Sequence, residues 1–238
     1  MTILSIDTAT KICSAALWQD GKVIEHKINN EDGNHARLLP IFIDELLHIA
    51  RDKNIKIDAV AISEGPGSYT GLRIGAGTAK GLCYGLDVPL IPIYTTEVLC
   101  ASLIAKYKAF SDSILCPMID ARRMEVYAAY YDSEINPLTD IKAVVVDSVE
   151  ALLQPIKLYA KKVCFFGDGA DKCHGIITEE KTIKCEVISD IVPDARYMGD
   201  LAAKLINVRK VVGKALAYYE PFYLKDYIAA PSHVKGLR

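Results

Sequence analysis

The sequence predicts an α/β protein made of two similar lobes, each with a mixed β-sheet. Short apolar runs typical of strands alternate with helical periodicities along the chain, a pattern that favours sheets covered by helices. The opening pattern also recurs halfway along the chain. Ile6-Asp7 and Ala15-Ala16 reappear as Ile119-Asp120 and Ala128-Ala129, 113 residues later. The second half is therefore expected to repeat the first.

The composition excludes several classes of protein. Of the 238 residues, 51% are hydrophobic and 24% are charged, which is a globular mix and unlike a disordered or fibrous chain. The 28 basic and 30 acidic side chains nearly balance, so phosphate neutralisation alone would not hold a nucleic acid. No apolar stretch reaches the roughly 18 residues of a membrane span. Seven cysteines without a Cys-x-x-Cys pair indicate free thiols in a reducing compartment, so we expect a soluble cytoplasmic protein.

Each element of the first half follows from a local pattern. Asp20-Gly21 separates two β-like runs and predicts a tight hairpin turn, because glycine adopts a positive φ without steric cost. Apolar residues recur at 3.6-residue spacing over residues 38–50 and predict an amphipathic helix. The other predicted elements are strands at residues 2–7, 13–19, 22–28, 58–64 and 89–94, and helices at about 70–86 and 95–106. This order predicts a mixed sheet.

The second half repeats this order less clearly. The predicted strands span residues 114–120, 125–132, 143–147 and 162–167, and the predicted helices span 148–154 and 194–207, with Asp194 as the N-cap of the last. Two consecutive βββα units are typical of the duplicated ribonuclease-H-like fold of actin, hexokinase and the chaperone ATPases. We therefore expect lobes at residues 1–106 and 107–238, with the last helix packing back on the first lobe.

The most informative motif is a glycine-rich string from Glu64 to Gly75, between a predicted strand and a predicted helix. One interpretation is a phosphate cradle, since glycines let the amides of a helix N-terminus face an anion. The other is tight packing, because each interior glycine costs about 1 kcal/mol relative to alanine and so requires a compensating contact. Gly77, Gly81 and Gly85 share one helical face, which favours a close helix–helix contact, within the chain or between subunits.

Few side chains are candidates for catalysis or ligand binding. Asp7 and Asp120 end equivalent strands, where a carboxylate can orient a metal or a phosphate-bound water, or can cap the following turn. Thr8 offers a hydroxyl to a phosphate, whereas Arg122 and Arg123 make the second turn unlike a phosphate loop. None of the five histidines has a histidine partner at i+3 or i+4, so no helical metal pair exists.

Two further features have a structural and a functional interpretation. For His35, just before the first predicted helix, a structural role is favoured over metal binding. The tail from Tyr218 to Tyr227 carries five aromatic residues around Pro221. An exposed aromatic tail would mark a partner surface, while a docked tail would complete the core.

Three segments together resemble the bacterial TsaB (YeaZ) family. They are Ile3-Leu4-Ser5-Ile6-Asp7-Thr8-Ala9-Thr10, His35 with Leu38-Leu39-Pro40, and Gly65-Pro66-Gly67-Ser68-Tyr69-Thr70-Gly71-Leu72-Arg73-Ile74-Gly75. The ending Glu220-Pro221-Phe222-Tyr223-Leu224 is also similar, although Lys225 stands where an arginine is common. The similarity follows the chain in order, and residues 105–215 match loosely.

The resemblance implies an actin-like fold and a non-catalytic role in tRNA modification. TsaB proteins are paralogues of TsaD, the enzyme that attaches a threonylcarbamoyl group to N6 of adenosine 37 in tRNAs reading codons that start with A. The implied partners are TsaD and the ATPase TsaE, with tRNA reached through the complex and a homodimer formed when the chain is alone. The chain itself would require no cofactor, and ATP or ADP would be expected at the partner interface.

The resemblance also implies which residues matter. TsaD holds a metal with a His-x-x-x-His pair, and Thr95 and Leu99 occupy the matching positions here, so we expect neither transferase nor peptidase activity. The implied partner contact uses the first two helices, with His35, Leu38, Leu39, Phe42, Gly71, Arg73, Ile74, Gly77 and Gly81. The alternative function is a self-sufficient actin-like ATPase or phosphotransferase, with Asp7 and Thr8 at the phosphates.

Overall fold

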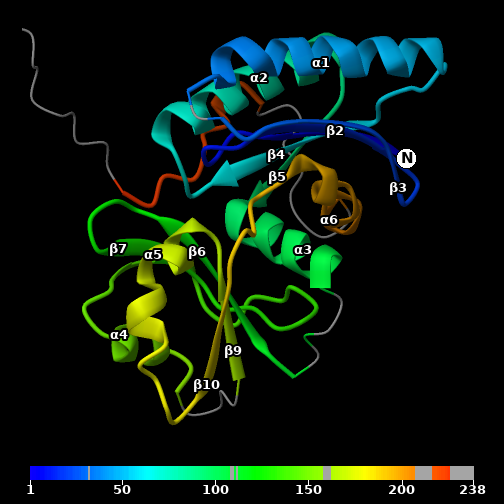
Figure 1. Ribbon diagram of the computed structural model, residues 1–238. Helices are drawn as coiled ribbons and strands as arrows, with labels where there is room; N and C mark the ends of the chain where they lie inside the picture. Colours follow the sequence, from blue (N-terminus) through cyan, green and yellow to red (C-terminus); the bar gives the residue numbers. More distant parts are fainter. Residues whose placement is uncertain (32, 108–109, 111, 158–161, 207–215, 226–238) are drawn as a thin grey trace, which may run out of the picture.

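The computed structural model describes residues 1–31, 33–107, 110, 112–157, 162–206 and 216–225. The chain forms two lobes, one above the other in Figure 1, and each lobe is built on a five-stranded sheet. Among the described helices, none combines the length and the apolar character that a membrane span requires.

The first sheet has the strand order β3-β2-β1-β4-β5. Strands β1 to β3 are antiparallel, while β1, β4 and β5 are parallel, which confirms the predicted mixed sheet. Asp20 and Gly21 both have positive φ, 45° and 84°, as a primed hairpin turn requires. The strands are β1 (Thr2–Asp7), β2 (Cys13–Gln19), β3 (Lys22–Asn29), β4 (Ala59–Gly65) and β5 (Leu90–Tyr94).

The second sheet repeats this topology with the order β10-β9-β6-β7-β8. Its central strand β6 is antiparallel to β7 and parallel to β9, just as β1 is to β2 and β4. Asp7 and Asp120 end the two central strands, so the internal sequence match marks a structural duplication. The strands are β6 (Ile114–Asp120), β7 (Glu125–Ala128), β8 (Lys142–Val145), β9 (Lys162–Phe166) and β10 (Lys184–Ile188).

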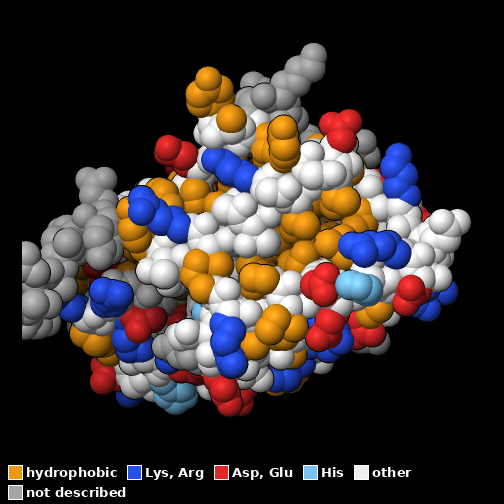
Figure 2. Space-filling view, turned by 90° about the horizontal axis from the view of Figure 1, so that it is seen from above, with side chains coloured by type: hydrophobic (Ala, Val, Ile, Leu, Met, Phe, Trp, Pro, Cys, Tyr) orange, Lys and Arg blue, Asp and Glu red, His pale blue; other side chains and the backbone are white. Residues whose placement is uncertain are grey.

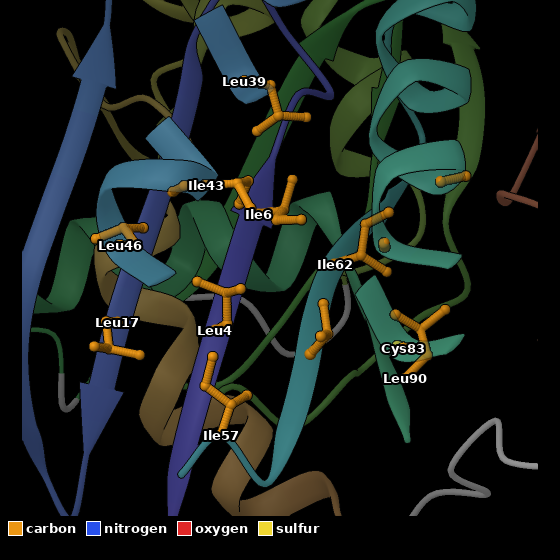
Figure 3. Packing of buried hydrophobic residues seen from close by; sticks show 14 of the residues in the cluster. Leu4, Ile6, Leu17, Leu39, Ile43, Leu46, Ile57, Ile62, Cys83 and Leu90 are labelled. Carbon is orange, nitrogen blue, oxygen red and sulfur yellow. The ribbon is translucent and has the colours of Figure 1, made fainter. Parts of the chain in front are cut away.

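Helices α1 (His35–Asp52) and α2 (Tyr69–Leu86) cover one face of the first sheet (Figure 1). Leu4 and Ile6 of β1 point to this face and belong to the same core cluster as Leu46 of α1 (Figure 3). Their alternation along β1 is that of a strand with two buried faces. The predicted amphipathic helix is thus confirmed, and it begins earlier than the apolar periodicity indicates.

The other face of the first sheet is covered by α6 (Met198–Leu205) and by part of α3 (Thr95–Tyr107). Helix α6 follows the second lobe in sequence but packs on β1 and β5 of the first. Gly199 permits this contact, because a Cβ there would lie 2.1 Å from the ring of Trp18. Helix α3 also packs on β6 and therefore lies between the lobes (Figure 1).

The second lobe differs from the sequence prediction in several elements. Helix α4 (Val149–Leu153) was expected, but α5 (Asp168–Ile177) and β10 are not predicted by the apolar patterns. The strand expected to continue to residue 132 ends at Ala128, after which Tyr131 forms an isolated bridge with Leu115.

The last predicted helix starts where expected. The carboxylate of Asp194 accepts the amide of Arg196 at 2.8 Å and caps a 3₁₀ turn (Ala195–Tyr197) that leads into α6, which confirms the predicted cap. The predicted end of that helix, Asn207, lies outside the described residues.

Candidate functional site

A cavity of about 660 Å³, here called the cleft, lies between the two lobes. Four segments contribute most of its lining: residues 9–11 after β1, residues 66–72 at the start of α2, residues 120–122 after β6, and residues 222–225 of the tail. Small-molecule sites occupy about 300–1,000 Å³, so the cleft has the size of a ligand site. The residues predicted to meet a phosphate belong to, or directly precede, the two turns in its wall.

In the first turn, after β1, the polar side chains are buried and form hydrogen bonds with the chain itself. Asp7 and Thr8 are both 0% exposed. The Asp7 carboxylate accepts the Ala9 amide at 3.2 Å, and the Thr8 hydroxyl donates to the carbonyl oxygen of Gly71 at 2.8 Å. Burial raises the pKa of Asp7 to about 7, although hydrogen bonds from Ser63 and Ala9 oppose the shift. Neither side chain lines the cleft, so neither can contact a phosphate there unless the turn opens.

Three glycines of the string allow the start of α2 to pack directly against this turn. A Cβ at Gly67 would lie 2.1 Å from the carbonyl oxygen of Ala9. A Cβ at Gly71 would lie 2.0 Å from the carbonyl oxygen of Thr8, and one at Gly75 would lie 2.4 Å from the Thr8 hydroxyl. Larger side chains cannot fit at these distances. The packing interpretation is confirmed for this part of the string, but the contact is with a strand-ending turn and not with a helix.

In the second turn, after β6, Lys172 of α5 binds the polar groups. Its ammonium donates to the Asp120 carboxylate, to the carbonyl oxygen of Arg123 at 2.8 Å and to that of Glu125 at 2.7 Å. These three bonds use all of its N–H groups. Arg122 and Arg123 have φ of 68° and 50°, a left-handed conformation uncommon for residues with a Cβ. Sequence reasoning missed Lys172, because it lies 52 residues after Asp120 and in a helix without a clear pattern.

The two positions implied to have lost metal ligands are buried in α3. The hydroxyl of Thr95 lies 2.9 Å from that of Ser63, and Leu99 packs in the core between the lobes. Across the part of the chain that the structure describes, no group of three or more His, Cys, Asp or Glu residues could hold a metal ion.

His35 has a structural position at the start of α1. Its Nε2 lies 3.0 Å from the carbonyl oxygen of Thr10 and 3.1 Å from that of Ile12. Because carbonyl oxygens only accept, Nε2 must carry the proton. The side chain is 8% exposed, so it fastens α1 to the segment before β2 and agrees with the favoured structural interpretation.

The outward side of α1 and α2 is a second candidate site, here called the docking face. Figure 2 shows hydrophobic side chains gathered on this side of the molecule, with charged side chains around them. Beyond Gly77 and Gly81 the space is open, since no other part of the described chain would come within 4 Å of a Cβ there. The docking face comprises the exposed or half-buried residues Leu38, Ile41, Phe42, Arg73, Ile74, Gly77, Gly81 and Tyr84.

Three residues assigned to a partner contact lie inside the chain instead. Leu39 is 0% exposed and packs in the core under α1, Gly71 is buried against Thr8, and His35 is held by backbone carbonyls. In the single chain these three residues therefore offer little surface to a partner. The assignment of all nine residues to a partner contact stays a prediction.

The duplicated sheets and the helices on their faces define the class of the protein, an actin-like fold made of two ribonuclease-H-like lobes. A solved structure shares this architecture: YeaZ from Pseudomonas aeruginosa superposes with a TM-score of 0.76 at 24% identity, over 94% of this chain and 99% of that one.

Sequence comparison then identifies the family. Residues 22–231 match the family model of TsaD, tRNA N6-adenosine threonylcarbamoyltransferase. The tRNA threonylcarbamoyladenosine biosynthesis protein TsaB of Escherichia coli (strain K12) is 31% identical over 234 residues, covering 96% of each chain. TsaB of Haemophilus influenzae is 30% identical, over 96% of this chain and 95% of its own. The chain therefore belongs to the TsaB family.

Proposed function

We propose that this chain is a non-catalytic subunit of the bacterial system that forms N6-threonylcarbamoyladenosine at position 37 of tRNAs reading codons that start with A. Its relatives are named as biosynthesis proteins of this modified nucleoside. Its task is to bind and activate a catalytic TsaD paralogue. TsaE and tRNA join through that complex, and the chain forms a homodimer when the paralogue is absent. The site of action is the cytoplasm, in keeping with seven free cysteines.

The observation that carries this proposal is the closure of both turns beside the cleft. In an actin-like ATPase these turns must offer polar groups to phosphates. Here the hydroxyl of Thr8 is bound to Gly71, and Asp7 is fully buried. Lys172 takes up the carboxylate and two carbonyl oxygens of the second turn. The Asp120 side chain is 42% exposed and lines the cleft, but its Oδ1 already bonds Lys172 and the Arg122 amide. Turns bonded in this way support a subunit without nucleotide turnover of its own, and any ATP or ADP would bind at the partner interface.

The docking face supports the proposed partnership. Small residues allow close approach of another helix, and apolar neighbours supply burial. Ile41 is 47% exposed and Tyr84 is 87% exposed, although both are large and apolar or aromatic. An apolar face with bare glycines between such residues is typical of a helix-pairing surface.

The experiment is a light-scattering mass measurement of the chain alone and mixed with its TsaD paralogue, in one buffer. The expected result is a homodimer that converts to a complex with one copy of each protein. In parallel, ATP hydrolysis by the purified chain should remain at background. Failure to associate, together with ATP turnover by the lone chain, would favour the alternative of a self-sufficient ATPase and would mean that the first turn opens.

A further inference from the structure

The tail after α6 crosses the mouth of the cleft and touches both lobes. Its residues 222–225 line the cleft, and Tyr219 is buried in the first-lobe core. Figure 1 shows this segment in orange and red, running past α2 toward the side of the molecule where β7 lies. Residues 219–225 are called the strap below.

The first-lobe end of the strap is held by the backbone and by buried packing. The amide of Phe222 donates to the carbonyl oxygen of Glu64 at 2.8 Å. Its carbonyl oxygen lies so close to Gly65 that a Cβ there would be 2.5 Å away, and Gly65 has a φ of +119°, so glycine is required. The Phe222 ring meets the ring of Tyr94 edge-on, with centroids 5.3 Å apart.

The middle of the strap is held by an aromatic and cationic cluster at the start of α2. The rings of Tyr223 and Tyr69 have centroids 5.1 Å apart. The guanidinium of Arg73 lies 4.1 Å from the centroid of the Tyr69 ring, within the range of a cation–π interaction.

The second-lobe end of the strap is held differently. Lys225 forms an ion pair with Glu125 of β7, and its ammonium lies 5.9 Å from the centroid of the Tyr127 ring. The side chains of Lys225 and Glu125 are 37% and 22% exposed, so solvent and salt reach the pair. No backbone hydrogen bond joins the strap to the second lobe among the described residues.

Other lobe-to-lobe contacts come from α3 and do not line the cleft. The hydroxyl of Thr96 lies 2.7 Å from that of Tyr131, and the ammonium of Lys106 donates to the carbonyl oxygen of Asp190 at 3.3 Å. Helix α3 thus joins the lobes as a hinge would. The strap joins them across the cleft mouth.

We propose that the strap is a clamp that holds the two lobes closed over the cleft, with the Lys225–Glu125 pair as its releasable latch. The first-lobe end of the strap is attached more strongly than the second-lobe end, because backbone hydrogen bonding and aromatic packing are stronger than a partly exposed ion pair. Release therefore occurs at the second lobe, and the strap stays on the first. This inference concerns the chain alone and does not depend on the proposed function.

Hydrogen–deuterium exchange of the full chain tests the clamp. The variants are Lys225→Gln, Glu125→Gln and the double variant, in low-salt buffer. Exposed ion pairs contribute up to about 1 kcal/mol, so exchange should accelerate by up to about fivefold at residues 66–72 and 120–127, which border the cleft. Adding 0.5 M sodium chloride to the wild-type chain should have the same effect. The matched control is Lys157→Gln, which removes an exposed ion pair with Glu150 inside the second lobe.

The three variants also test whether the two side chains act as one latch. If they do, the double variant exchanges no faster than either single variant. Exchange at the cleft that is unchanged by Lys225→Gln, or effects that simply add in the double variant, would overturn the proposal. Should Lys225→Gln fail to fold, as judged by rapid exchange in β1, the salt series on the wild-type chain decides: acceleration supports the clamp and constant rates refute it.

Discussion

The docking face yields a sharp prediction about Gly77. Replacing Gly77 with leucine should leave the lobe folded, because no other part of the described chain lies within 4 Å of the new Cβ. Replacing an interior helical glycine should even stabilise α2, by about 1 kcal/mol. In a docked complex the same side chain would fill a close helix–helix approach. Overpacking of this kind costs about 1–3 kcal/mol, which corresponds to about 5- to 150-fold weaker association.

The assay is light-scattering mass over a dilution series, for the chain alone and with the TsaD paralogue. The matched control is Gly175→Leu, since Gly175 lies on the exposed side of α5 and also has no neighbour within 4 Å of a Cβ. The control should gain similar helix stability and associate like the wild type. Equal association of the two variants would refute the assignment of Gly77 to a partner contact.

Three other substitutions probe the interior. Asp7→Asn should gain stability relative to the wild type as pH rises from about 4 to about 7. Over this range the unfolded chain ionises Asp7 while the folded chain keeps the proton, so the wild type loses up to about 1.4 kcal/mol of stability per pH unit. Lys172→Met should lower the free energy of unfolding by about 1–3 kcal/mol in denaturant titrations, because it removes three hydrogen bonds that hold the second turn to α5. Gly199→Ala should displace α6 from Trp18, the single tryptophan, and shift its fluorescence to the red.

Each of these has an outcome that would contradict it. A pH-independent difference between Asp7→Asn and the wild type would mean that Asp7 is not protonated in the folded chain. The exposed Lys181→Met is the control for Lys172, and equal stabilities would show that the ammonium bonds are dispensable. Unchanged emission of Gly199→Ala would mean that α6 accommodates a methyl group without moving.

The first lobe could be predicted from sequence because its patterns are local. Each of its patterns can be recognised within a short stretch of sequence. They are the alternation along the strands, the Asp20-Gly21 turn and the 3.6-residue period of α1. Helix α5 lacks such a signal, since Gly169 and Gly175 interrupt it and Lys172 turns a cation inward. The structure shows that α5 and β10 stand where α2 and β5 stand in the first lobe, so the duplication extends to two elements that the sequence analysis did not predict.

The candidate site was harder to predict, because its contacts join distant parts of the chain. The glycine string signalled close packing, but no local pattern identifies Thr8 as the partner of Gly71, 63 residues away. The exposed glycines Gly77 and Gly81 and the buried Gly71 look alike in sequence, and their different surroundings arise only when α2 lies on the sheet. The tail offered two open interpretations, and its docked form depends on residues roughly 100 or more positions earlier in the chain, such as Glu64 and Glu125.

Lys172 gives the second turn a counter-ion that belongs to the chain. A cation carried on a side chain has a local concentration fixed by the fold, and it can be neither diluted, exchanged nor chelated. Two of the three Lys172 bonds go to carbonyl oxygens, including that of Arg123, so this left-handed segment is held without an ion taken from solution. The turn therefore needs no divalent ion to satisfy the Asp120 carboxylate and these two carbonyl oxygens.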